Sequence, residues 1–66
     1  MIIELNGSER EVPDGTTVAA LMDQIGAPPR GSAAVVDGEV LPRSSWDEHV
    51  LRTWQVVEVI TAVQGG

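Results

Sequence analysis

The sequence predicts an α+β fold in which a mixed sheet of about five strands wraps around one helix, with one further short helical turn. Two hairpin signals, Asn6-Gly7 and Asp37-Gly38, each follow a short apolar run, and both positions of such turns tolerate positive φ. Between the hairpins, residues 18–25 carry apolar side chains at helical spacing. An apolar stretch at residues 56–63 adds a last strand, and this order of elements is typical of the α+β class.

The first hairpin and the helix have clear boundaries. Residues 2–5 and residues 8–12 are the two strands of the hairpin. Thr16 and Thr17 are both candidates for the helix N-cap, because a threonine oxygen can accept a hydrogen bond from an unpaired backbone N–H. Gly26 is a natural C-terminal cap. The helix then presents one apolar stripe, made of Val18, Leu21, Met22 and Ile25.

The second hairpin and the short helical turn follow a loop that contains two prolines. Residues 33–36 and 39–41 are the strands of this hairpin. Ser44 or Ser45 is then expected to cap a single helical turn over residues 46–49. This turn would connect the second hairpin to the last part of the core.

The connection to the last strand contains residues whose structural roles can be predicted. Trp46 is expected to pack over the open end of the small core. Val50 and Leu51 are expected to add core material. His49 is expected at the surface or at a helix end, because no partner residues for catalysis surround it. Arg43 is expected to hold the local turn.

The last strand decides the architecture. Alternation along residues 56–63 places Val57, Val59 and Thr61 on one face of the strand, and Glu58, Ile60 and Ala62 on the other. If this strand pairs beside the first, the sheet wraps the helix in the β-grasp arrangement, which is the fold of ubiquitin. We therefore expect a β-grasp domain over residues 1–63 and a flexible tail over residues 64–66.

Composition excludes several functions. The chain of 66 residues has no cysteine and one histidine, so disulfides are excluded and a metal site is not expected. Ten acidic residues against four arginines give a net charge of −6, which repels nucleic acid and favours a basic protein surface as partner. No signal peptide and no membrane-spanning segment are recognised, so we expect a cytoplasmic protein without a membrane partner.

The reactive part is predicted to be the end of the chain, Gln64-Gly65-Gly66, which reaches about 10 Å when extended. Glycines are thin and conformationally free, so they can enter a narrow channel of another protein. A carboxylate is a poor electrophile and must first become a mixed anhydride with AMP. A sulfur nucleophile can then displace AMP, and no side chain on Gly66 hinders the attack.

Two segments carry a resemblance to a known family. Residues 36–46, VDGEVLPRSSW, and residues 57–66, VEVITAVQGG, resemble the ThiS family of thiamine-biosynthesis sulfur carriers. The resemblance covers essentially the whole chain. The Pro-Arg-x-x-Trp element at residues 42–46 is more similar to ThiS than to the related small subunit of molybdopterin synthase.

The resemblance implies a reaction route. An E1-like adenylating enzyme would use ATP and Mg²⁺ to activate Gly66. Sulfur drawn from cysteine by a desulfurase would convert the carboxylate to a thiocarboxylate, and thiazole synthase would take that sulfur for the thiazole of thiamine. In this scheme the chain is a co-substrate that has no catalytic residue and binds no cofactor of its own.

One segment departs from the family pattern, and one surface is a docking hypothesis. ThiS proteins commonly have an Asp-Gly-Asp type of turn before the last strand, where this chain has Thr53-Trp54-Gln55. Trp54 lacks the turn chemistry of glycine, and tryptophan is enriched in binding hot spots. An exposed apolar strand face next to a reactive terminus would be a docking patch. The residues predicted for partner docking are Glu58, Ile60, Ala62 and Trp54.

Three alternatives remain open from the residues alone. The chain could be a ubiquitin-like modifier that is conjugated through Gly66, although it has no lysine for chain building. It could be a sulfur carrier for another pathway, which would share the chemistry but not the acceptor. It could also be a small binding module with an incidental Gly-Gly end. Only the resemblance favours the thiamine pathway.

Overall fold

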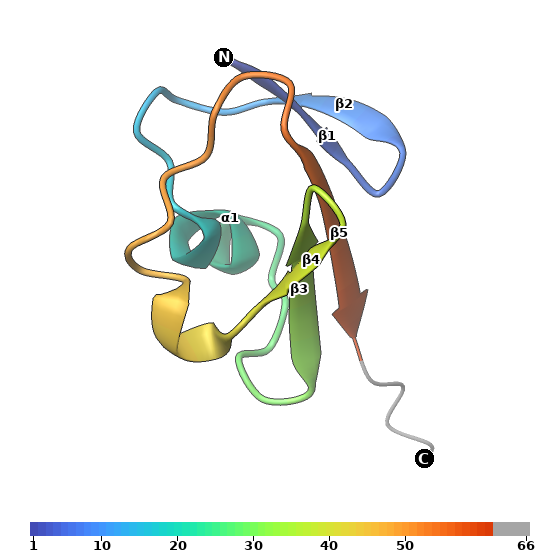
Figure 1. Cartoon of the computed structure of the whole chain (residues 1–66), viewed down its shortest axis with the longest axis vertical. Coiled ribbons are helices and arrows are strands. Elements are labelled where there is room, and N and C mark those ends of the chain that lie inside the picture. Colours follow the sequence, from blue (N-terminus) through green and yellow to red (C-terminus); the bar gives the residue numbers. More distant parts are fainter. Residues whose placement is uncertain (62–66) are drawn as a thin grey trace.

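The computed structural model describes residues 1–61 of the chain, and Figure 1 shows their arrangement. It confirms the predicted α+β class, with one α-helix and a five-stranded sheet in the described residues. Residues 62 and 63 of the predicted last strand lie outside the described residues. The elements in chain order are β1 (Ile2–Leu5), β2 (Ser8–Glu11), α1 (Val18–Gln24), β3 (Ser32–Val36), β4 (Glu39–Leu41), the 3₁₀-helix η1 (Arg43–Ser45) and β5 (Val56–Thr61).

The sheet has the predicted mixed topology, with strand order β2-β1-β5-β3-β4. β5 lies between β1 and β3, and it is parallel to β1 and antiparallel to β3. The two hairpins β1–β2 and β3–β4 therefore lie on opposite sides of the last strand. In Figure 1, α1 lies against one side of this sheet. This is the β-grasp arrangement, and it makes β5 the centre of the fold.

The core lies between α1 and one face of the sheet, which we call the inner face. Three residues of the apolar stripe of α1, Val18, Leu21 and Met22, are buried, as the helical spacing predicts. The buried residues that the sheet contributes are Ile3, Ala34, Val36 and Val57. Each of these buried side chains except that of Ala34 contributes about 1.5–3 kcal/mol through removal of apolar surface from water.

The start of α1 is held by hydrogen bonds from two parts of the chain. Thr17 is the N-cap, and its Oγ1 accepts from the backbone N–H of Ala20 at 3.1 Å. The N–H groups of Val18 and Ala19 donate to the carbonyl oxygens of His49 and Trp46, at 3.0 and 3.1 Å. The connection after β4 therefore satisfies helix N–H groups that have no partner inside the helix.

The end of α1 follows the prediction for Gly26. This glycine has φ +71 and directly follows the C-cap residue Ile25. The N–H of Gly26 donates to Asp23 O at 3.1 Å, and the N–H of Ala27 donates to Met22 O at 3.0 Å. These two bonds form a Schellman motif, in which the left-handed residue is usually glycine because it has no Cβ.

Two predictions for the connection between β4 and β5 are wrong. A serine was predicted to cap the helical turn over residues 46–49, but the 3₁₀-helix η1 precedes that turn and has no side-chain cap. The turn itself follows directly, and the N–H groups of Glu48 and His49 both donate to Ser45 O at 3.1 Å. η1 begins directly after Pro42, whose φ of −58 and missing N–H suit the residue before a helical turn. Val50 is 51% exposed while Leu51 is 2% exposed, because successive residues of an extended segment point to opposite sides.

Trp46 is buried, as predicted. The side chain is 5% exposed and belongs to the core cluster. Its indole Nε1 donates to the carbonyl oxygen of Leu41 at 2.9 Å, so the one polar atom of the ring is satisfied. His49 is half-buried in the same connection, where its carbonyl oxygen receives the bond from Val18.

Candidate functional site

The sheet face that α1 does not cover is called here the outer face. Residues directly opposite each other on neighbouring strands point to the same side of a sheet. The registers of the five strands therefore assign a continuous row of residues to this face from β2 to β4, and all of them are exposed or half-buried. Its residues are Glu9 and Glu11 (β2), Ile2 and Glu4 (β1), Val56, Glu58 and Ile60 (β5), Ala33 and Val35 (β3) and Val40 (β4).

One half of the outer face is apolar. Ile60 lies opposite Ala33, and Val35 lies opposite both Glu58 and Val40. Ile60 is 57% exposed and Val40 is 71% exposed. We call Ala33, Val35, Val40 and Ile60 the apolar patch. The predicted exposure of Ile60 is confirmed, and no element among the described residues shields it from solvent.

The other half of the outer face is acidic. Glu4 of β1 lies directly opposite Glu9 of β2, and Glu11 lies opposite Ile2. Like charges in a cross-strand pair are destabilising, so this arrangement does not serve folding. None of the strand residues that share this face is basic. The outer face therefore combines an apolar patch with a carboxylate-rich half, and Glu58 lies between the two.

The tail leaves from the apolar half. Thr61, the last residue of β5, pairs with Ser32 at the start of β3, and Figure 1 places this end of the sheet opposite the chain's N-terminus. Ile60 of the apolar patch immediately precedes Thr61 in the chain. The predicted docking residue Ala62 and the predicted tail residues Gln64, Gly65 and Gly66 lie outside the described residues.

The turn before β5 resolves the departure from the family pattern. Trp54 adopts φ +65, the left-handed conformation that glycine favours, and its side chain is 59% exposed. A left-handed conformation costs a residue with a Cβ about 1–2 kcal/mol. The backbone N–H of Trp54 donates to Ile2 O at 2.6 Å. The turn therefore keeps its geometry despite the bulky residue, and the indole gains little burial in return.

Gln55 and Asp37 hold this turn from both sides. Gln55 Oε1 accepts from the backbone N–H of Arg52 at 2.9 Å, and its Nε2 donates to Asp37 Oδ2 at 3.0 Å. Asp37 Oδ1 also accepts from the backbone N–H of Val56 at 3.0 Å. These bonds, that from Val56 first and that from Gln55 second, lower the pKa of Asp37 below its ordinary value of 3.8.

The predicted docking residues do not form one cluster. Glu58 and Ile60 are neighbours on the outer face of β5, as the alternation predicts. Trp54 lies at the other end of the strand, and six residues of extended chain separate it from Ile60, which is about 20 Å. In Figure 1 the orange segment that leads into β5 lies close to the N-terminus, far from the end of β5.

Several residues of the outer face were not predicted from the sequence. Val40, Ala33 and Val35 complete the apolar patch, and Glu4 and Glu9 complete the acidic half. Each strand alternates as expected, so their side of each strand could be inferred. Which strands lie next to each other could not, because strand order depends on contacts between distant segments.

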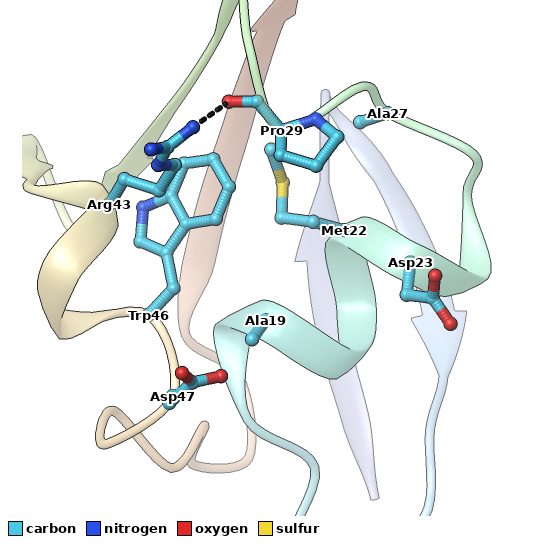
Figure 2. Close-up of a pocket in the computed structure, with 8 residues that line it drawn as sticks. All are labelled: Ala19, Met22, Asp23, Ala27, Pro29, Arg43, Trp46 and Asp47. Carbon is cyan, nitrogen blue, oxygen red and sulfur yellow. Dashed lines mark hydrogen bonds between the residues drawn. The ribbon is translucent and has the colours of Figure 1, made fainter.

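A cavity of about 330 Å³ lies on the helix side of the molecule. Figure 2 shows Met22 and Trp46 facing it, with Asp23 and Asp47 at its margin. Arg43 Nη1 donates to Pro29 O at 3.4 Å across it, so the guanidinium bonds to the proline loop and not, as predicted, to its own turn. The cavity is remote from the outer face, on which the predicted docking residues of β5 lie.

The described residues form neither a metal-ligating cluster nor a membrane-spanning helix. Within residues 1–61, no group of three or more metal-ligating side chains comes together. The one α-helix in this part of the chain is too short to span a bilayer.

The mixed five-stranded sheet that packs on one helix defines a ubiquitin-like β-grasp protein. The model of the ThiS family matches residues 2–66, and the chain therefore belongs to the ThiS family. It is 24% identical over 66 residues to the sulfur carrier protein ThiS of Escherichia coli, with full coverage of both chains. The resemblance to a sulfur carrier of thiamine biosynthesis is thereby confirmed at the level of the family.

Solved structures agree with this assignment. The crystal structure of the thiamine biosynthesis protein ThiS from Geobacter metallireducens superposes with a TM-score of 0.84 at 25% identity, and all of both chains is covered. A solution structure of a thiamine biosynthesis protein from the same organism gives a TM-score of 0.82 at 25% identity. That comparison covers the whole of this chain and 88% of the other.

Proposed function

We propose that the chain carries sulfur on the carboxyl group of Gly66 and acts as a co-substrate of other enzymes. The observation that carries this proposal is the apolar patch on the outer face. Ile60, 57% exposed, lies on the strand that leads directly to the terminal glycines. A small core has no structural reason to leave such a side chain in water, whereas a docking surface next to the reacting group needs one.

The chemistry takes place on the partner enzymes. An E1-like adenylating enzyme uses ATP and Mg²⁺ to convert the Gly66 carboxylate to an acyl adenylate, with release of pyrophosphate. The terminal sulfur of the persulfide that a desulfurase forms from cysteine then attacks the carbonyl carbon, so that a C–S bond forms and the C–O bond to AMP breaks. A thiol reductant cleaves the S–S bond of the resulting acyl disulfide and leaves the thiocarboxylate. Thiazole synthase accepts sulfur from the resulting thiocarboxylate.

The globular body supplies recognition. Its net charge of −6 and its acidic half attract a basic protein surface and increase the rate of encounter. The apolar patch then provides contact area next to the tail, with Glu58 at its border. A docked carrier presents its carboxyl group at high effective concentration to the activating centre. In this scheme the body determines which enzyme is met, and Gly65 and Gln64 thread the tail into it.

The test is the intact mass of the chain after incubation with ATP, Mg²⁺, cysteine, a thiol reductant, a desulfurase and the adenylating enzyme of the same organism. We expect a mass increase equal to the difference between sulfur and oxygen, confined to the C-terminal peptide. A chain that lacks Gly66 should show no increase, because Gln64-Gly65 alone is shorter and presents its carboxylate one residue back. Equal modification of both chains would contradict the proposal.

The same experiment separates the alternatives. Covalent attachment of the chain to other proteins through Gly66 would identify a modifier rather than a carrier. A thiocarboxylate that thiazole synthase does not consume would identify a carrier for another pathway. An unmodified chain under all these conditions would leave only a binding module.

A further inference from the structure

Trp54, in the turn before β5, combines a backbone conformation and a side-chain exposure that folding alone does not explain. Its backbone has φ +65, where glycine would be unstrained, and 59% of its side chain is exposed. Bulky residues with positive φ are outliers and persist only where surrounding contacts hold them. Since the exposed indole gains little from burial, stability does not account for a tryptophan at this position.

The turn is built to hold this residue in place. Gln55 bonds both to Arg52 in the turn and to Asp37 in the β3–β4 hairpin. The N–H of Trp54 and the hydroxyl of Thr53 both donate to Ile2 O, at 2.6 and 3.3 Å. The turn is therefore tied to β1 and to the β3–β4 hairpin. The backbone that carries the indole is therefore held before binding, which reduces the entropy lost in a complex.

The surroundings of Trp54 favour a basic partner. Ile2, whose carbonyl oxygen holds the turn, lies opposite Glu11 on the outer face. The next outer-face residue of β1 is Glu4, which is bonded through its N–H to Gln55 O at 2.9 Å. The turn itself contributes one cation, Arg52. Two copies of a chain with a net charge of −6 repel each other, so a second copy is not a suitable occupant.

We infer that Trp54 is a second anchor for the adenylating enzyme, inserted into an apolar slot that basic side chains border. This inference rests on the proposed function. Glu4 and Glu11, on the strands next to the turn, and the net charge of −6 suit a basic docking surface on that enzyme. Trp54 and the apolar patch lie at opposite ends of β5, about 20 Å apart, so together they extend the contact along the whole strand.

The size of a stable interface supports two anchors. A standard protein interface buries about 800 Å² on each partner, which is roughly a fifth of the 4349 Å² surface of this chain. The four side chains of the apolar patch, Ile60 included, cannot supply this area alone. Tryptophan is among the residues that most often dominate binding energy, so its removal should have a large effect.

The test uses two substitutions that suit the left-handed backbone. In Trp54→Gly and Trp54→Asn the indole is removed and φ +65 is tolerated, so both variants should melt at or above the wild-type temperature in circular dichroism. Trp54→Phe keeps an aromatic ring. Val50→Ala is the matched control, because Val50 is also apolar and 51% exposed but lies outside both anchors.

Affinity for the purified adenylating enzyme of the same organism is measured by titration calorimetry with ATP and Mg²⁺ present. We expect a loss of roughly tenfold or more for Trp54→Gly and Trp54→Asn, and a smaller loss for Trp54→Phe. Val50→Ala should bind like the wild type. Wild-type affinity of the glycine and asparagine variants would overturn the inference, as would an equal loss in Val50→Ala.

A failure of this inference can be distinguished from a failure of the proposed function. If the wild-type chain is converted to the thiocarboxylate and the Trp54 variants bind normally, only the second anchor is wrong. If the wild-type chain is never activated at Gly66, the sulfur-carrier proposal fails, and the inference that rests on it fails too.

Discussion

The two faces of the sheet are built from the same strands but serve different ends. On β5, Val57 is fully buried against the inner core, while Ile60 on the opposite face is 57% exposed. The inner face has a helix to cover it and contains only apolar residues at its centre. The outer face has no cover, and it carries both exposed aliphatic side chains and a like-charged pair, Glu4 and Glu9. The difference shows that packing fixes one face and that recognition is the better explanation for the other.

The largest expected effect comes from placing a charge on the inner face. Val57→Asp would bury an unpaired carboxylate at a position that is 0% exposed. The change should lower the free energy of unfolding by more than about 4 kcal/mol, which a domain of this size does not survive. Loss of the cooperative melting transition in circular dichroism is the measurement. A variant that still melts near the wild-type temperature would mean that the core accommodates a carboxylate at position 57, and that the burial of Val57 is not required for folding.

The same charge on the outer face should separate folding from binding. Ile60→Asp lies three residues further along β5, at a position already in contact with water. We expect the free energy of unfolding to change by less than about 1 kcal/mol. The affinity for the adenylating enzyme should fall by roughly tenfold, because the apolar patch loses its centre.

Ile60→Thr is the matched control for charge, because it keeps the β-branched shape and removes apolar area only. Its affinity should lie between those of the wild type and Ile60→Asp. Unchanged adenylation kinetics in Ile60→Asp would exclude the apolar patch from docking, and unfolding of this variant would contradict the distinction between the two faces.

A smaller loss of stability is expected from a change at the start of α1, the helix that covers the inner face. Thr17→Ala removes the oxygen that accepts from the N–H of Ala20 at the start of α1. The free energy of unfolding should fall by about 1 kcal/mol, measured by urea denaturation. Thr17→Ser restores the acceptor and should recover most of the loss. No difference between the alanine and serine variants would mean that the carbonyl groups of Trp46 and His49 suffice to begin the helix.

The smallest effect concerns the link between the β3–β4 hairpin and the Trp54 turn. The pKa of Asp37 is lowered by the backbone N–H of Val56 and the side chain of Gln55. A carboxyl group with a depressed pKa in the folded state contributes stability above its unfolded pKa, and this contribution is lost as the pH falls through the folded value. Stability should therefore decrease slightly below about pH 4.

Asp37→Asn isolates this contribution, since asparagine tolerates the positive φ of the turn and cannot ionise. Denaturation midpoints measured between neutral pH and about pH 3 should show a smaller acid-dependent loss in the variant than in the wild type. Identical pH profiles would mean that the link does not contribute to the stability of the fold.

Much of the fold could be predicted because its signals are local. The Asn6-Gly7 and Asp37-Gly38 turns adopt positive φ as the dipeptides predict, and Thr17 and Gly26 cap α1 as expected. The serine cap of the turn over residues 46–49 was predicted wrongly, since η1 precedes that turn and starts after Pro42 without a side-chain cap. The exposure of Val50 was also missed, because periodicity alone does not say which of two adjacent apolar residues faces the core.

The candidate site could be predicted only in part. Alternation along β5 placed Glu58 and Ile60 on the open face, because this depends on a period of two residues. It could not show that Val40 shares this face with Ile60, or that Trp54 lies at the opposite end of the strand. Gly65 and Gly66 remain predictions from the sequence, since they lie beyond the described residues.

The sequence by itself determined the elements, the hairpin turns, the helix caps and the family, because each depends on neighbouring residues or on motifs read in order. Only the tertiary structure decided that carboxylates from β1 and β2 gather beside the apolar patch, and that a tryptophan is held in a left-handed conformation. These features depend on which distant strands pair and on hydrogen bonds such as those that join Gln55, Asp37 and Ile2. Contacts between segments remote in sequence impose a geometry that local preference would reject.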